Sequence, residues 1–179
     1  MADGRTFNDD LVAAIQQLGT ERTFDKREMV LREGEVEKNV YYVVSGAVRV
    51  FLLSEHEELT IRFGYEGSII NSLSSFIKGT PSEFYIETIR KTTLRIIDRE
   101  HFLRIAHSGT ESLKQYTALL ELLVTQQIER EIDLLTVSPS ERLQRVLARS
   151  PHLFQQIPLK YIASYLRMTP ETLSRVRNS

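Results

Sequence analysis

The residues best suited to chemistry lie near the C-terminal end of the sequence, where polar side chains surround two apolar ones. Helical spacing from Pro170 places Leu173 and Val176 on one face, and the polar set around them is Thr169, Glu171, Thr172, Ser174, Arg175 and Arg177. A guanidinium on such a helix can take O6 and N7 of one guanine, and a carboxylate one turn earlier can accept from a cytosine amino group. We expect Arg175 to read a base. The alternative is an ion pair between Arg175 and Glu171 on a solvated helix.

The same end of the chain is basic. Residues 139–179 hold seven Lys or Arg side chains against two Glu, in a chain whose formal net charge is −1. This asymmetry indicates an anionic partner, although a solvated helix surface would give the same pattern. Lys160 is the candidate for a phosphate contact that does not depend on base sequence.

Short helices must position these residues. Ser138 followed by Pro139 is typical of a helix start, with Glu141 three residues after the cap, and this helix should end near Arg149. Pro158 opens a second helix over 159–166, and Thr169 with Pro170 opens a third after a turn of three residues. Two short helices separated by such a turn predict a helix-turn-helix over 138–179.

The middle of the chain is rich in strand patterns. A short helix is expected before Gly19, and from Phe24 to Asp98 short β-rich runs alternate with turns. In 59–65, Leu59, Ile61, Phe63 and Tyr65 alternate with smaller or polar residues, which predicts a strand with one buried face. The spacing of these runs favours an antiparallel sandwich or barrel, so the fold class is α+β.

A long helix is predicted between these two parts. Residues 111–136 contain no Gly or Pro, and their apolar residues form two stripes. The first comprises Leu113, Tyr116, Leu120 and Leu123, and the second Leu119, Leu122, Ile128, Ile132 and Leu135. One stripe can pack on the barrel and the other on a second copy of the chain, which predicts a homodimer. The alternative is a core helix of a monomer. The expected domains are a sensor over 1–110, a dimerisation helix over 111–137 and a reader over 138–179.

The order of these features resembles the Crp/Fnr family. The resemblance rests on Glu33-Gly34, on the segment 42–50 (Tyr-Val-Val-Ser-Gly-Ala-Val-Arg-Val), on the long helix, and on the segment 157–175 with its Thr-Pro-Glu-Thr-Leu-Ser-Arg ending. It implies a jelly-roll sensor domain of the cyclic nucleotide-binding type and a bacterial transcription regulator. It also implies an inverted-repeat DNA site, phosphate contacts by Thr172 and Ser174, RNA polymerase as a partner and a small-molecule effector.

Two departures from the family pattern bear on function. The sequence stops soon after Arg177, where relatives continue into a β-wing, so either the protein is naturally without that wing or the sequence is truncated. A dimeric sensor or interaction module that no longer binds DNA on its own is therefore the alternative function. In the sensor, Asn71-Ser72 stands where the resemblance places Gly-Glu, and Ser82-Glu83 stands where it places Arg-Ser. Without an arginine to pair with the phosphate, cyclic AMP binding is not expected.

One interpretation of the sensor is a pocket for an effector of another kind. The residues expected to line its pocket are Arg62, Asn71, Ser72, Ser74, Ser75, Ser82, Glu83 and Arg90. The alternative is a helix cap and a polar turn with no ligand.

Several functional classes are excluded by what the sequence lacks. Without cysteine there is no disulfide framework, thiol chemistry or iron–sulfur site, and a reducing cytoplasm is expected. The four histidines (His56, His101, His107 and His152) show no ligand spacing, and no nucleophile elbow or phosphate loop occurs. We therefore expect no enzyme, metal or cofactor. No apolar run is long enough to span a membrane.

Overall fold

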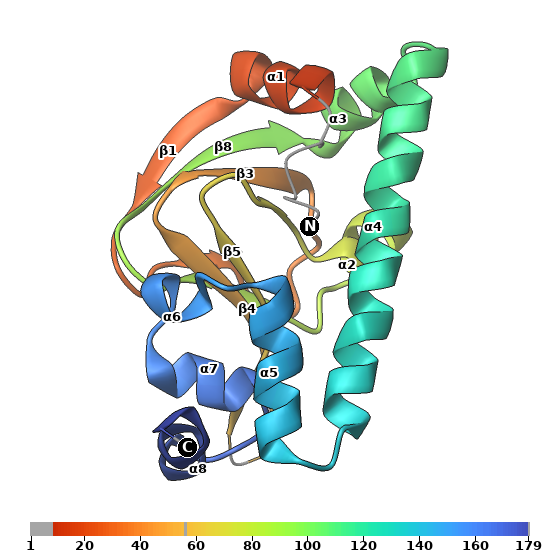
Figure 1. The fold of residues 1–179 in the computed structure, drawn as a ribbon. Helices are drawn as coiled ribbons and strands as arrows, with labels where there is room; N and C mark the ends of the chain where they lie inside the picture. The colour runs from red at the N-terminus through yellow and green to blue at the C-terminus, as the bar shows by residue number, and fades with distance from the viewer. Residues whose placement is uncertain (1–8, 56, 179) are drawn as a thin grey trace.

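A computed structural model describes residues 9–55 and 57–178, and two four-stranded antiparallel sheets form its centre (Figure 1). The first sheet has the order β1-β8-β3-β6 and the second the order β2-β7-β4-β5. The strands are β1 (Thr20–Phe24), β2 (Met29–Leu31), β3 (Asn39–Ser45), β4 (Ala47–Leu53), β5 (Glu58–Tyr65), β6 (Ile69–Ile70), β7 (Tyr85–Thr88) and β8 (Thr92–Asp98). This jelly-roll arrangement confirms the predicted α+β class.

The helices flank this β-roll. They are α1 (Asp9–Leu18), α2 (Leu73–Lys78), α3 (Arg99–Ala106), α4 (Thr110–Leu135), α5 (Pro139–Arg149), α6 (Leu153–Gln156), α7 (Leu159–Tyr165) and α8 (Pro170–Asn178). In Figure 1, α4 runs along one side of the β-roll, and α5 to α8 gather at one end of it. Hereafter the β-roll with α1 to α3 is called the sensor, and α5 to α8 are called the reader.

Three apolar clusters hold these parts together. The interior of the β-roll contains Val43, Val48, Ile86 and Leu94 among its buried residues. A second cluster joins α1, α2, α3 and α4 to β3 and β8. The third joins the reader to the outer side of the second sheet, where Ala47 and Ile89 are buried together with reader residues such as Leu173. The reader thus shares an apolar core with the sensor.

The turn between β3 and β4 depends on a glycine. Gly46 has a φ of 95°, which L-residues with a Cβ rarely adopt, and an added Cβ would lie 2.6 Å from the carbonyl oxygen of Lys91. This close approach brings the β7–β8 turn against the start of β4, and Ala47 N–H donates to Thr92 Oγ1 at 3.1 Å.

Strand β5 differs from its predicted form. Its pairing with β4 shifts between Val50 and Phe51, so Ile61 is an extra residue in the strand. Gly64 packs against Ile70 inside the β-roll, whereas Phe63 and Tyr65 pack on the reader. The prediction of one buried face was therefore wrong, because the reader covers the face that would otherwise meet solvent.

The stripes of α4 also differ from those predicted. Tyr116 and Leu123 from the first stripe and Leu119 from the second all pack on the sensor cluster. The outward face instead carries Leu113, Val124, Ile128 and Leu135, which are exposed, together with Leu120, which is half-buried. Both predicted stripes mixed residues of the two faces, because hydropathy alone does not say whether an apolar side chain packs on the sensor or points outward.

Candidate nucleic-acid interface and effector site

Helix α8 presents its polar residues outward. Thr169 begins the helix, because its Oγ1 accepts the backbone N–H of Thr172 at 3.2 Å. Leu173 is fully buried and Val176 half-buried against the reader core, while Glu171, Ser174, Arg175 and Arg177 are exposed. Thr172 is half-buried and Thr169 exposed. The exposed face of α8 is therefore polar and ends in two arginines.

Arg175 has no ion pair with Glu171 in the described part of the chain. The carboxylate of Glu171 lies at the start of the helix, where its own backbone N–H and the Thr169 hydroxyl hold its pKa below the usual range. Lys160, at the start of α7, is exposed, and its ammonium lies 4.5 Å from the centre of the Tyr161 ring. Arg175 and Lys160 are thus both placed where a partner can reach them.

Three of the seven basic residues in the C-terminal segment serve the fold instead. Arg142 donates to the carbonyl oxygens of Thr136 at 2.7 Å and Leu166 at 2.6 Å, and so binds the C-terminal ends of both α4 and α7. Arg145 and Arg149 pair with Glu129 and with the fully buried Asp133 of α4. The basic residues left for an anionic partner are Lys160, Arg167, Arg175 and Arg177. Of these, Arg167 forms an ion pair, with its Nη1 3.5 Å from Oε1 of Glu57.

The reader is also joined to the sensor by polar contacts along β5. This strand lies at the edge of its sheet, and Ser164 of α7 bonds to its backbone. The Ser164 hydroxyl donates to Glu58 O at 2.8 Å and accepts from Thr60 N–H at 3.0 Å. The helix thereby satisfies backbone groups that an edge strand would otherwise expose to another chain.

A buried arginine lies at the centre of this junction. Arg49 of β4 is 3% exposed and pairs with Glu87 at 2.7 Å and with Glu58. Its guanidinium lies 4.0 Å from the ring centre of Phe51 and 4.3 Å from that of Tyr161 in α7. Arg90 adds a further contact, donating to Gln156 O at 2.8 Å. The sequence offered no signal for the role of Arg49, because its partners lie on other elements.

Inside the sensor, a second buried charge lies beside the predicted effector residues. Glu37 is 1% exposed, and its carboxylate accepts from Asn39 N–H at 2.9 Å, Tyr41 OH at 3.1 Å and Ser72 N–H at 3.3 Å. Burial raises the pKa of Glu37, and burial together with the Glu37 charge raises the pKa of Tyr41. Glu37 was not among the residues expected from the sequence.

The predicted effector residues fall into separate groups. Ser72, Ser75 and Ser82 are buried together: the hydroxyls of Ser72 and Ser82 are hydrogen-bonded at 2.8 Å, and Ser75 Oγ accepts from Glu37 N–H at 2.9 Å. Nearby, Asn71 is half-buried and Ser74 and Glu83 are exposed. Arg62 lies instead on β5 against Gln126 of α4, and Arg90 lies against α6. The structure does not bring the eight residues into one pocket.

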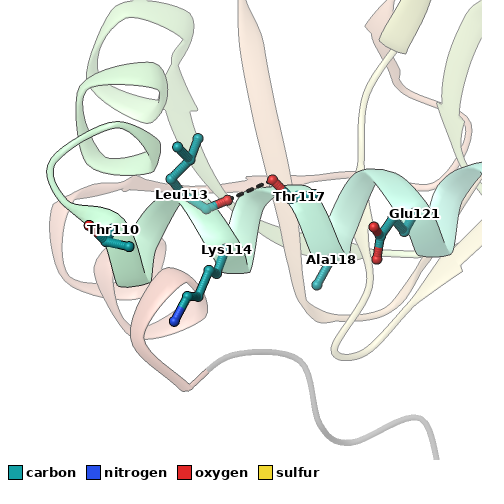
Figure 2. A pocket seen from close by; sticks show the side chains of 6 residues that line it. All are labelled: Thr110, Leu113, Lys114, Thr117, Ala118 and Glu121. Carbon is teal, nitrogen blue, oxygen red and sulfur yellow. Dashed lines mark hydrogen bonds between the residues drawn. The ribbon is translucent and has the colours of Figure 1, made fainter.

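A surface hollow of about 680 Å³ adjoins the Glu37 group. Its lining includes Leu31, Glu35, Glu37, Lys38 and Tyr41. A smaller hollow of about 340 Å³ lies on the N-terminal half of α4, and Figure 2 shows that its lining residues, including Leu113, Lys114 and Glu121, all come from that helix.

Within the described residues, neither a group of metal ligands nor a membrane-spanning helix is found. Across 9–55 and 57–178, no three His, Asp or Glu side chains come together as ligands, and His56 lies outside the described residues. Over the same ranges, no helix combines the length and hydropathy of a membrane span.

The comparisons with known proteins agree with this architecture. Residues 21–108 match the family model of the cyclic nucleotide-binding domain. FixK2 from Bradyrhizobium japonicum has 23% sequence identity and a TM-score of 0.76, with 89% of this chain and 83% of that chain covered. The catabolite activator protein of Thermus thermophilus has 21% identity and a TM-score of 0.59, with 97% and 84% covered.

A third solved structure has the same fold. The c-di-GMP responsive global regulator CLP of Xanthomonas campestris has 16% identity and a TM-score of 0.68, with 96% of this chain and 90% of that chain covered. No curated protein sequence matches this chain. Residues 21–108 thus resemble the cyclic nucleotide-binding domain, and the chain as a whole has the fold of FixK2 and of the catabolite activator protein. The predicted resemblance is confirmed at this level.

Proposed function

We propose that this protein is a dimeric transcription regulator whose helix α8 binds the major groove of DNA. The observation that carries the proposal is the division of α8 into a buried apolar face, with Leu173, and an exposed polar face that ends in Arg175 and Arg177. A helix preceded by a short helix and a tight turn, with such a face outward, is the reading element of helix-turn-helix proteins. CLP, one of the structures with this fold, is described as a regulator of gene expression.

The rest of the proposal follows from the arrangement of the elements. The sensor (1–110), the dimerisation helix (111–137) and the reader (138–179) act as its functional parts. The exposed apolar stripe of α4 would join two copies, and a two-fold dimer would read half-sites about 34 Å apart in an inverted repeat. RNA polymerase is the expected protein partner, and a small molecule other than cyclic AMP the expected effector.

A gel-shift titration of the full chain with a pool of genomic DNA fragments tests this function. We expect a subset of fragments to be retained at protein concentrations that leave the rest free. The affinity for DNA should fall about tenfold or more as salt is raised from 50 to 200 mM. The reason is that each basic side chain that neutralises a phosphate releases counterions, which is less favourable at high salt. Equal retention of every fragment, or none at low salt, would refute DNA reading and favour a sensor or interaction module.

A further inference from the structure

The side of α4 that faces the sensor is apolar near the N-terminal end of the helix and polar further along. Near the N-terminal end it carries the buried Leu119, which packs in the apolar cluster with α1 and α3. Further along, the same side carries Gln126, Arg130 and Asp133, at helical spacing. Arg130 and Asp133 are 7% and 0% exposed. Charged groups therefore lie buried where α4 passes between the sensor and the reader.

Arg130 is incompletely compensated in this position. Its guanidinium lies 3.8 Å from the centre of the Tyr165 ring of α7, and its buried Nη1 has no hydrogen-bond partner among the described residues. Asp133 attracts it, but Asp133 is already paired with Arg145 at 3.0 Å and with Arg149. Arg142 and Arg167 repel it, and burial lowers the pKa of Arg130. A buried charge with an unused donor is costly unless a further partner binds.

Arg62 of β5 reaches the same side of α4. It donates to the side-chain oxygen of Gln126, a neutral amide, and no carboxylate pairs with it in the described part of the chain. Burial lowers the pKa of Arg62 as well. Gln126 and Arg130 are four residues apart and so lie about 6 Å from each other on one face of α4. Arg62 from the sensor strand and Arg130 from the long helix both interact electrostatically with Tyr165 of α7.

Taken together, these contacts describe a site with more guanidiniums than carboxylates. Around it lie Arg62, Arg130, Arg142, Arg145 and Arg149, whereas the carboxylates paired there are Glu129 and Asp133. Planar guanidiniums match the oxygen geometry of phosphate and carboxylate groups. We propose that Arg62 and Arg130 bind an oxyanion, the phosphate or carboxylate group of a small metabolite, at the junction of β5, α4 and α7.

The site has a direct structural link to the reader. Tyr165, whose ring covers Arg130, is the last residue of α7 and also packs on Phe63 of β5, with ring centres 5.2 Å apart. An oxyanion bound beneath this ring would add contacts that hold α7 against β5. The effect of the oxyanion on DNA binding rests on the function proposed above, but oxyanion binding itself does not.

Thermal unfolding of the full chain with inorganic phosphate tests the site, with acetate as the carboxylate probe and sodium chloride at equal ionic strength as the reference. We expect phosphate, acetate or both to raise Tm beyond the chloride reference in a saturable way, since a ligand that binds only the folded protein stabilises it. The probe with the larger effect identifies which oxyanion the site prefers. An identical Tm in all three salts would overturn the proposal.

Two variants separate this site from general anion effects. Arg62→Gln removes one guanidinium, and Arg130→Lys keeps the charge but loses the planar fork. Each should weaken binding of the preferred probe about tenfold or more, as expected for the loss of a charge-assisted hydrogen bond. Arg104→Gln, on the exposed side of α3, is the control and should bind like the unchanged protein. Equal weakening in Arg104→Gln, or no weakening in Arg62→Gln, would overturn the proposal.

A gel shift at fixed ionic strength then distinguishes the two proposals. If phosphate binds and depends on Arg62 while no DNA is selected, the oxyanion site stands and the proposed function fails. If DNA is selected but no oxyanion stabilises the chain, the function stands and the site is refuted.

Discussion

The buried carboxylate of Glu37 makes the stability of the sensor depend on pH at one residue. Because burial raises its pKa, the folded protein favours the protonated form more than the unfolded chain does. Its contribution to stability is therefore present below the ordinary value of 4.5 and is lost as pH rises through the raised value. Glu37→Gln cannot titrate. As pH rises through this window, the free energy of unfolding of the unchanged protein should therefore fall relative to that of Glu37→Gln.

Chemical denaturation at a series of pH values measures that difference. Glu66→Gln, in the exposed turn after β5, is the matched control and should follow the unchanged protein at every pH. A constant difference between Glu37→Gln and the unchanged protein across the series would show that Glu37 does not titrate in the expected direction.

Arg175 and Lys160 should affect DNA binding in different ways. Arg175→Ala should cost about 1–3 kcal/mol of discrimination at one base pair in each half-site, because a bidentate contact to guanine is lost. Lys160→Ala should weaken binding to all sequences alike and reduce the slope of log affinity against log salt by about one. Binding titrations on a set of single-base operator variants measure both effects. If the two variants change the base preference equally, Arg175 has no reading role.

The residues of α8 could be found from the sequence because they are neighbours on one helix. Periodicity alone separates Leu173 and Val176 from the polar residues between them. Glu37 could not be found in this way, since its partner Ser72 is 35 residues distant and the contact forms only when α2 folds against the β3 region. The same holds for Arg49 and Glu87, which are 38 residues apart.

At the scale of elements, the exposed stripe of α4 is the feature with the clearest consequence. Val124 and Ile128 are 59% and 53% exposed, and together they extend the stripe that begins at Leu113. The double variant Val124→Glu, Ile128→Glu should be monomeric, because a dimer would have to bury charges without partners. Sedimentation velocity measures the mass. Thr125→Glu lies to the side of the stripe and should leave the dimer intact.

The elements were predictable where hydropathy is periodic or where capping residues mark a helix start. The long helix was expected over 111–136 and is found at Thr110–Leu135, and Ser138 caps α5 as its sequence predicted. Strand β1 was missed, because four of its five residues are exposed and no alternation marks them. It forms through backbone pairing with β8, to which side-chain hydropathy gives no clue. Helix α6, of four residues, is too short for periodicity to reveal.

At the scale of the whole molecule, Ser164 holds the reader on the sensor through two backbone hydrogen bonds. Ser164→Ala would leave Thr60 N–H without its partner, at a cost of about 1–3 kcal/mol. We expect faster hydrogen exchange in α7 and α8, because the variant opens the junction without touching the reader core. Ser174→Ala, on the exposed face of α8, is the control. Unchanged exchange in Ser164→Ala would show that the apolar cluster alone fixes the reader.

The position of Ser164 on the edge of β5 also bears on how the protein is made. It lies 104 residues after Thr60, so a ribosome that adds about 5–20 residues per second needs about 5–20 s to complete that interval. During synthesis the edge of β5, with Phe63 and Tyr65, stays uncovered for that time. We therefore expect nascent chains to expose an unpaired strand edge and apolar side chains that the finished chain covers, and slow translation of the last third to lengthen that exposure.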